Sequence, residues 1–202
     1  MKPIYKLWLM NYQQAWYDLD QAKQQDLGGK ISNCLAQNGA KSLLTAVSLW
    51  ADEKWAVWGI EEFPDIEAVM KHSQALNELQ WCRYIKCRSS LGTLIWPEAN
   101  LTIPEAPLYR LAQFKMNEVW YHLSDAEKKA WDEKNEQANN QVGAHIICGC
   151  DTSWSNEEWG TWVLETYPSL EAAYKHTMVL GNQGWYQYAK AISVLGVKYS
   201  ME

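Results

Sequence analysis

The segment WGIEEFP, at residues 58–64, recurs as WVLETYP at residues 162–168. The repetition extends in both directions, because residues 5–92 align without a gap with residues 109–196, always 104 positions further along the chain. Five tryptophans of the first copy are tryptophans again in the second. Self-similarity over such a length indicates a duplicated structural unit. The sequence therefore predicts one fold, present twice.

Each copy predicts the same order of elements. In the first copy these are a strand at 5–10, a helix from about Asp20 to Gln37, strands near 41–49 and 55–61, a second helix after Pro64, and a strand that begins at Trp81. The second copy has the same elements 104 positions later, and its first helix starts at a capping box formed by Ser124 and Glu127. Gly28 and Gly29 lie inside the first helix, where they predict a kink or a break.

The order βαββαβ is typical of the ferredoxin-like arrangement, a four-stranded antiparallel sheet with two helices on one face. The strands carry apolar residues on both faces, so the face without helices needs a second sheet to cover it. We therefore expect an α+β protein in which two ferredoxin-like repeats, 1–92 and 109–202, form an intramolecular dimeric α/β barrel. Residues 93–108, which contain three prolines, would link them.

Composition restricts the partners of the protein. The net charge of −6 and the isoelectric point of about 5.3 disfavour nucleic acid. No stretch approaches the ~20 apolar residues that a membrane helix needs, and no secretory signal opens the chain. We expect a cytoplasmic protein with reduced cysteines, no metal site and no contact with a membrane, and further pairing of the fused barrel into an oligomer stays open.

Certain residues resemble a known superfamily. The two copies resemble the dimeric α/β-barrel superfamily. More narrowly, Trp162 with Tyr167 and Pro168, and the segment 184–188, resemble an uncharacterised bacterial family of small barrel proteins. The superfamily includes cofactor-independent monooxygenases, muconolactone-isomerase-like proteins, haem-degrading enzymes and chlorite-dismutase-like proteins. The resemblance implies a ligand cavity between each sheet and its helices. Asn11 resembles an asparagine that oxygen-activating relatives use, although Lys115 replaces it in the second copy.

Two histidines are the leading polar candidates. His72 and His176 occupy equivalent positions on the second helix of each copy, on the flank of its apolar stripe. They could act as a general base, or as the axial ligand of haem as in haem-binding relatives. The alternative is a structural histidine that is half-buried and hydrogen-bonded to a neighbouring loop.

Aromatic and acidic residues also recur. Trp58, Tyr84, Trp162 and Tyr188 could line a pocket for a flat aromatic ligand, or form barrel core. Glu61 and Glu165 end the third strand of each copy; each is a catalytic carboxylate if buried and an ordinary surface group if not. Cys148 and Cys150 share one strand face, but no second ligand pair accompanies them, so a metal site is not predicted.

We interpret the chain as a small-molecule-binding α/β-barrel protein. One candidate function is that of a cofactor-independent monooxygenase- or isomerase-like enzyme. Its catalytic histidines would be His72 and His176, and no cofactor is predicted. The alternatives are a haem-binding or haem-modifying protein, and a non-catalytic interaction module. The sequence decides neither the substrate nor which copy is functional.

Overall fold

The computed structural model describes residues 2–97 and 101–199, and the chain divides into two compact units. Unit 1 contains the described residues up to Thr93 together with Tyr199, and unit 2 runs from Leu94 to Lys198. The predicted linker, 93–108, includes residues 98–100, which lie outside the described part of the chain. The predicted repeat boundaries stay predictions.

Unit 1 follows the predicted order, with a short additional helix and a 3₁₀ turn. Its elements are β1 (Ile4–Tyr12), α1 (Gln14–Tyr17), α2 (Gln21–Gln37), β2 (Lys41–Val47), β3 (Val57–Phe63), α3 (Ile66–Glu78), the 3₁₀ turn η1 (Trp81–Arg83) and β4 (Ile85–Trp96), whose last three residues are assigned to unit 2.

Unit 2 repeats this order. Its elements are β5 (Leu108–Met116), α4 (Glu118–Tyr121), α5 (Asp125–Val142), β6 (His145–Asp151), β7 (Thr161–Tyr167), α6 (Leu170–Asn182), η2 (Trp185–Gln187) and β8 (Ala189–Lys198). The predicted fold class, α+β with two βαββαβ repeats, is therefore confirmed. That the two sheets form one barrel concerns the placement of the units and stays a prediction.

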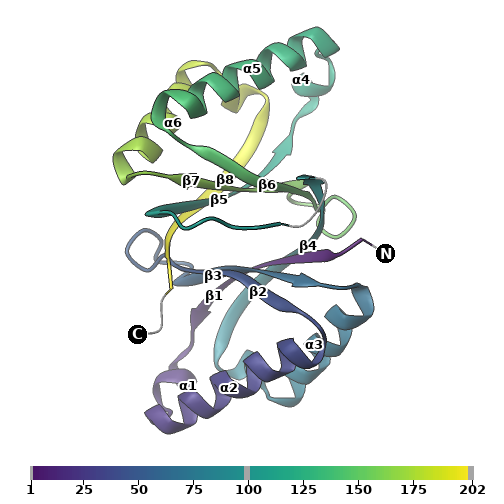
Figure 1. Ribbon diagram of the computed structural model, residues 1–202, viewed down its shortest axis with the longest axis vertical. Coiled ribbons are helices and arrows are strands. Elements are labelled where there is room, and N and C mark those ends of the chain that lie inside the picture. Colours follow the sequence, from purple (N-terminus) through teal and green to yellow (C-terminus); the bar gives the residue numbers. More distant parts are fainter. Residues whose placement is uncertain (1, 98–100, 200–202) are drawn as a thin grey trace. The chain divides into compact units, whose positions relative to one another are not determined.

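Each unit has an antiparallel sheet with its helices on one face (Figure 1). In unit 1, β1 pairs with β3 and β4, and β2 pairs with the other edge of β3. In unit 2, β5, β7, β8 and β6 pair in the same way. The register is also conserved, since Lys6 lies opposite Glu61 and Arg110 lies opposite Glu165. The first and third strands therefore bring a cation and a carboxylate together in both units.

Alternation along the strands separates two kinds of side chain. On β1, Lys6 and Trp8 point to the helix side, whereas Leu7 and Leu9 point to the other side and are buried. Trp58, which pairs with Leu9, lies on that second side and is completely buried. The cation and the carboxylate of each sheet thus lie beneath the helices.

The long helices begin at side-chain caps. Asp20 accepts a hydrogen bond from the Lys23 amide at the start of α2, and the predicted capping box of Ser124 and Glu127 starts α5. A break at Gly28 and Gly29, one of the two predicted outcomes, is wrong, because α2 continues without interruption to Gln37. Two glycines reduce helix stability but leave the backbone free to remain helical.

The apolar stripe that the sequence predicts for the second helix, which in unit 1 contains Ile66, Val69, Ser73 and Leu76, coincides only in part with the buried face. In α3 the buried residues are Ala68, Val69 and His72, whereas Ile66 is exposed. In α6 they are Ala172, Ala173 and His176. Small alanines allow the helix to approach the sheet closely, and this packing places both histidines in the interior instead of on the flank.

The last strand of each unit begins later than predicted. Gln80 and Gly184 adopt positive φ angles of 54° and 79°, which end the preceding helix. The next residues form η1 and η2, in which the Tyr84 and Tyr188 amides donate to the carbonyls of Trp81 and Trp185. Because a left-handed residue reverses the chain, the tryptophans fall in the turn, and β4 and β8 start after it.

Two glycine substitutions test this account of the helices. Gly29 is exposed within α2, so Gly29→Ala should raise the free energy of unfolding by about 0.5–1 kcal/mol. Gly143 ends α5 with a φ of 68°, so Gly143→Ala should lower it by about 1–2 kcal/mol. Urea denaturation of both variants measures the difference, and equal effects would contradict a continuous α2 and an α5 that ends at Gly143.

Candidate functional site

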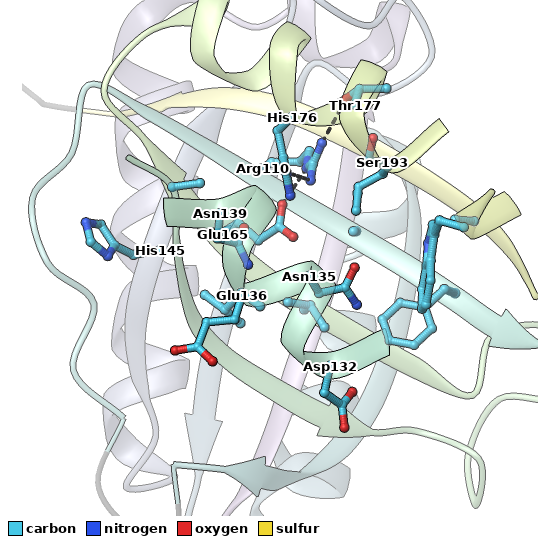
Figure 2. Close-up of a pocket in the computed structure, with 18 of the residues that line it drawn as sticks. Arg110, Asp132, Asn135, Glu136, Asn139, His145, Glu165, His176, Thr177 and Ser193 are labelled. Carbon is cyan, nitrogen blue, oxygen red and sulfur yellow. Dashed lines mark hydrogen bonds and ion pairs between the residues drawn. The ribbon is translucent and has the colours of Figure 1, made fainter. Parts of the chain in front are cut away.

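A pocket lies in unit 2, between the sheet and helices α5 and α6. It has a volume of about 630 Å³. Aromatic and apolar side chains form much of its wall, among them Phe114, Trp120 and Trp185. The polar side chains of Arg110, Asn139, Glu165 and His176 also line it (Figure 2). Such a mixture of apolar wall and few polar groups is typical of small-molecule sites.

A buried ion pair lies at the sheet side of this pocket. The Arg110 Nε of β5 is 2.5 Å from the Glu165 Oε2 of β7. One guanidinium nitrogen also donates to the Thr177 hydroxyl at 3.0 Å. Burying either charge alone would cost several kcal/mol, and the pairing of the two removes most of that cost. The guanidinium is therefore held in one orientation.

His176 of α6 closes the network. Its Nδ1 atom is 2.8 Å from Nη2 of Arg110 and 2.6 Å from the hydroxyl of Tyr167. Its Nε2 atom is buried and has no hydrogen-bond partner among residues 2–97 and 101–199. Burial lowers the pKa of His176 to about 4, although Glu165 acts in the opposite direction. The ring is therefore neutral at pH 7, and its Nε2 atom remains for a ligand.

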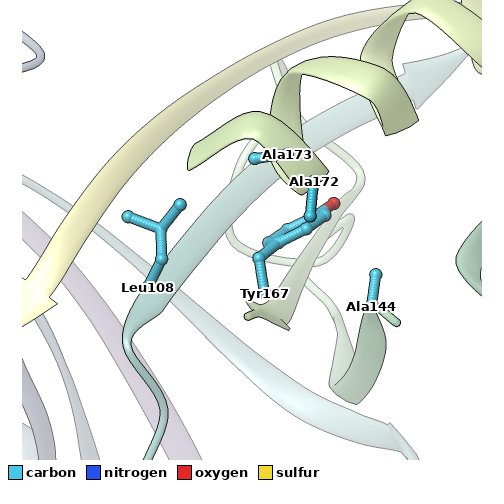
Figure 3. Packing of buried hydrophobic residues seen from close by; sticks show 5 residues of the cluster. All are labelled: Leu108, Ala144, Tyr167, Ala172 and Ala173. Atoms are coloured by element: carbon cyan, nitrogen blue, oxygen red, sulfur yellow. The ribbon is translucent and has the colours of Figure 1, made fainter. Parts of the chain in front are cut away.

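Tyr167 supports the network from the end of β7. Its ring packs with Leu108 and Ala144 beneath Ala172 and Ala173 of α6 (Figure 3). Its hydroxyl is 2.7 Å from Oε2 of Glu165. Burial raises the pKa of Tyr167, so the phenol keeps its proton. The small alanines are what allow α6 to bring His176 within reach of this hydroxyl.

Helix α5 contributes a second polar wall. Asn135 and Asn139 are one helical turn apart and both line the pocket. The Oδ1 atom of each is buried, and no other described group forms a hydrogen bond with it. Asn139 is itself buried at 7% exposure. Unpartnered buried amides are costly, so they indicate a ligand or water that would complete their hydrogen bonds.

Unit 1 has the corresponding site with altered chemistry. Lys6 replaces Arg110, and its Nζ is 3.6 Å from Oε2 of Glu61. Burial raises the pKa of Glu61, which Lys6 partly counteracts. Phe63 replaces Tyr167, so no hydroxyl reaches His72, and neither ring nitrogen of His72 has a partner in the described part of the chain. Burial lowers the pKa of His72 to about 4 as well.

The pocket of unit 1 is also smaller, about 420 Å³. Trp8 lies in it, over Gly59, where a Cβ atom would come within 2.4 Å of the indole. In unit 2, Ala112 and Val163 occupy these two positions. Loss of the indole accounts for the additional space in unit 2.

Comparisons with known proteins reveal a fold. No protein-family model and no curated protein matches the chain. Solved structures do match it. A haem-binding protein from Thermus thermophilus has a TM-score of 0.77 at 10% sequence identity, over 98% of this chain and 92% of that one. A variant of chlorite dismutase from Candidatus Nitrospira defluvii has a TM-score of 0.81 at 10% identity, over 98% and 91%.

The chain has the chlorite dismutase-like fold. The predicted resemblance to the dimeric α/β-barrel superfamily, to which these structures belong, is confirmed at the level of fold. The narrower resemblance to one bacterial family stays a prediction. Identity of 10% supports no statement on activity, since one fold hosts many unrelated chemistries.

Within this chlorite dismutase-like fold, the predicted histidines both line a pocket and the predicted aromatic residues do not. Trp58 and Trp162 are completely buried on the sheet face away from the helices. Tyr188 packs edge-on against Trp120 at a centroid distance of 6.2 Å. Tyr84 packs against Trp81. Other aromatic residues, such as Trp120 and Trp185, line the site of unit 2 instead.

Asn11 has a structural contact. Its side-chain amide donates to the Glu53 carbonyl, at 3.4 Å, in the loop before β3. Lys115, at the equivalent position of unit 2, donates to the Glu157 carbonyl at 2.9 Å. Both side chains attach the same loop to the first strand, which explains why lysine can replace asparagine there.

Arg110, Tyr167 and Lys6 were not among the predicted site residues. A signal for two of them was present, because a basic residue recurs at position 6 and 110, just as Glu61 and Glu165 recur. Repetition of a polar residue within a strand, on the side that faces the helices, would have indicated the ion pair. The tyrosine could not be found this way, because unit 1 has Phe63.

Metal binding has little support in the described residues. In residues 2–97 and 101–199, no three His, Cys, Asp or Glu side chains are grouped to hold an ion. Burial raises the pKa of Cys148 to about 12, which disfavours the thiolate that a metal requires.

None of the described helices is both long and apolar enough to span a membrane.

The neutral histidines predict a pH dependence of stability. A histidine in the unfolded chain has a pKa of about 6.5, so between pH 6.5 and about 4 the unfolded state binds protons that the folded state does not. The free energy of unfolding should therefore fall as the pH is lowered through this window. Guanidinium denaturation should show a shallower fall for the double variant His72→Gln/His176→Gln. An unchanged slope would mean that the two histidines have the same pKa in the folded and the unfolded chain.

Proposed function

We propose that the protein binds a flat small molecule in the pocket of unit 2. The single observation that carries this proposal is His176, which lines a cavity of about 630 Å³ and whose Nε2 atom is buried and unpartnered among the described residues. The aromatic side chains around it suit a planar ligand, which they would contact through ring faces and edges. Binding would give the exposed cavity wall and the histidine their missing partners.

A filled pocket tests this proposal. The double variant Ala112→Trp/Val163→Gly copies the Trp8 and Gly59 pair of unit 1, and it should abolish the binding of naphthalene ketones such as acetylnaphthalene to unit 2. Titration calorimetry measures the affinity, and thermal unfolding verifies that the variant folds. The matched control is Trp8→Ala, which enlarges the other pocket and should leave this affinity within about twofold. Equal binding by the parent and the filled variant would contradict the proposal.

Haem is the second candidate, because the fold neighbours include a protein described as haem-binding. The residues of unit 2 do not fit an axial iron ligand, since Nδ1 of His176 faces the Arg110 guanidinium, which can only donate, and its Nε2 atom therefore carries the proton. His72 fits better, because neither of its nitrogens is engaged with a described residue and its ring is neutral. Bound haem would supply redox chemistry, His72 would hold it, and Lys6 would lie nearby in the same pocket.

Haem titration separates these candidates. If haem binds through His72, a Soret band should develop and should be lost in His72→Ala, whereas His176→Ala should keep it. A band that depends on His176 instead would contradict the assignment of His72 as the ligand. The absence of any band would remove haem and leave the small-molecule proposal intact.

His72 and His176 differ in the proton-transfer step that each could perform. His72 has an unengaged nitrogen that could accept a proton from a substrate, as an isomerase-like or monooxygenase-like enzyme requires. His176 instead presents a proton to the pocket.

A purely structural module is the third candidate. Filled interiors are expected for such a module, whereas pockets of about 630 and 420 Å³ favour ligand binding.

A further inference from the structure

The hydrogen-bond partners of Nδ1 in His176 decide where its proton lies. An arginine has only donors, so Nη2 of Arg110, at 2.8 Å, requires a lone pair on Nδ1. The hydroxyl of Tyr167, at 2.6 Å, can also donate to Nδ1 or to Glu165. A proton on Nδ1 would point at the guanidinium, and both would be donors. The neutral ring therefore has its proton on Nε2.

We infer that Arg110 and Tyr167 act as positioning residues that hold His176 in the Nε2–H tautomer, so that the pocket of unit 2 selects a neutral, flat ligand with a carbonyl oxygen. The oxygen would accept a hydrogen bond from Nε2–H. This inference rests on the proposed function, which requires only that the pocket is occupied, and it adds the chemical class of the occupant.

The charges around the pocket favour a neutral ligand over an anion. The positive charge of Arg110 is already paired with Glu165 at 2.5 Å. The remaining charged side chains in the wall include Asp132 and Glu136, both acidic and both on α5. A carboxylate would therefore enter a site without an unpaired cation, and its loss of hydration would not be offset. A ketone, lactone or quinone oxygen carries no such cost.

Helix α5 would recognise a second polar edge. The amides of Asn135 and Asn139 line the wall from a different element than His176, as Figure 2 shows. Each amide has both an acceptor oxygen and a donor nitrogen, and each keeps a buried atom without a described partner. A ligand with a polar group on the edge remote from its carbonyl would engage them. This places the carbonyl at the sheet and the second group at α5.

Unit 1 provides a natural comparison for the tautomer. Lys6 pairs with Glu61 at 3.6 Å and is not among the hydrogen-bond partners of His72, and Phe63 has no hydroxyl. No described donor therefore determines which nitrogen of His72 carries the proton. The two copies thus have the same histidine in the same place, and only the second has a defined donor.

Nitrogen NMR of the imidazoles tests the tautomer without any ligand. In ¹⁵N-histidine-labelled protein at neutral pH, assigned through His72→Gln and His176→Gln, the His176 ring should show a protonated Nε2 and an unprotonated Nδ1. The exchange variant Arg110→Lys/Tyr167→Phe gives unit 2 the residues of unit 1 and should shift the signals toward a mixture of tautomers. A protonated Nδ1 in the parent protein would overturn the inference.

A ligand series tests the chemical class. Acetylnaphthalene, ethylnaphthalene and naphthoate have the same ring system and offer a neutral acceptor, no acceptor and an anion. The ketone should bind about 3- to 10-fold more tightly than the hydrocarbon, as one buried hydrogen bond allows, and the naphthoate should bind more weakly than the ketone. His176→Phe should abolish the preference for the ketone while keeping hydrocarbon binding.

The outcomes separate the inference from the proposed function. Equal affinity for the three compounds would support ligand binding in the pocket, but it would overturn the inference that His176 selects ligands with a carbonyl oxygen. Preference for naphthoate would overturn the argument from charge. Failure of all three to bind would overturn the proposed function for flat aromatic ligands, and with it the ligand class, even if the NMR signals show the Nε2–H tautomer.

Discussion

The chemistry of this protein depends on a buried cation placed next to a buried carboxylate by the register of the first and third strands. In unit 2 the pair is Arg110 and Glu165, whose side chains meet beneath α6. Two buried charges tolerate each other only at short distance and with further hydrogen bonds, so the guanidinium has little freedom. That rigidity extends to the imidazole of His176, because the same guanidinium occupies its Nδ1 atom. The register of β5 and β7 therefore determines the orientation of a hydrogen-bond donor, the His176 ring, in the wall of the pocket.

Duplication keeps this arrangement while the side chains diverge. Several exchanges distinguish the units at the site, and three of them are Lys6 for Arg110, Phe63 for Tyr167 and Trp8 for Ala112. The first two remove the hydrogen bonds that orient the histidine, and the third reduces the space beside it. All three lie on the helix side of the sheet. Strand pairing and histidine position are therefore compatible with two differently lined pockets.

The comparison of the predicted and observed site shows which errors a sequence pattern produces. Strand alternation placed Trp58 and Trp162 correctly within their strands, but it could not decide which face would contain a pocket, because both faces are apolar. Periodicity on α3 suggested that Ile66 faces inward, yet alanines and His72 do so. The helix packs closely through small residues, and a hydrophobicity pattern gives such residues little weight. The histidines were found because they recur, although their burial was not foreseen.

The sequence alone was sufficient for the repeated unit, the order of its strands and helices, and the caps at which the long helices begin. These are determined by local chemistry and by a period that can be counted along the chain. Only the tertiary structure decided that residues of β5, β7 and α6, up to 67 positions apart, form one hydrogen-bonded network. It also decided that Nδ1 of His176, and not its Nε2 atom, meets the guanidinium. Both depend on strand register and helix rotation, which are set by the packing of side chains distant in sequence, and no local pattern specifies them.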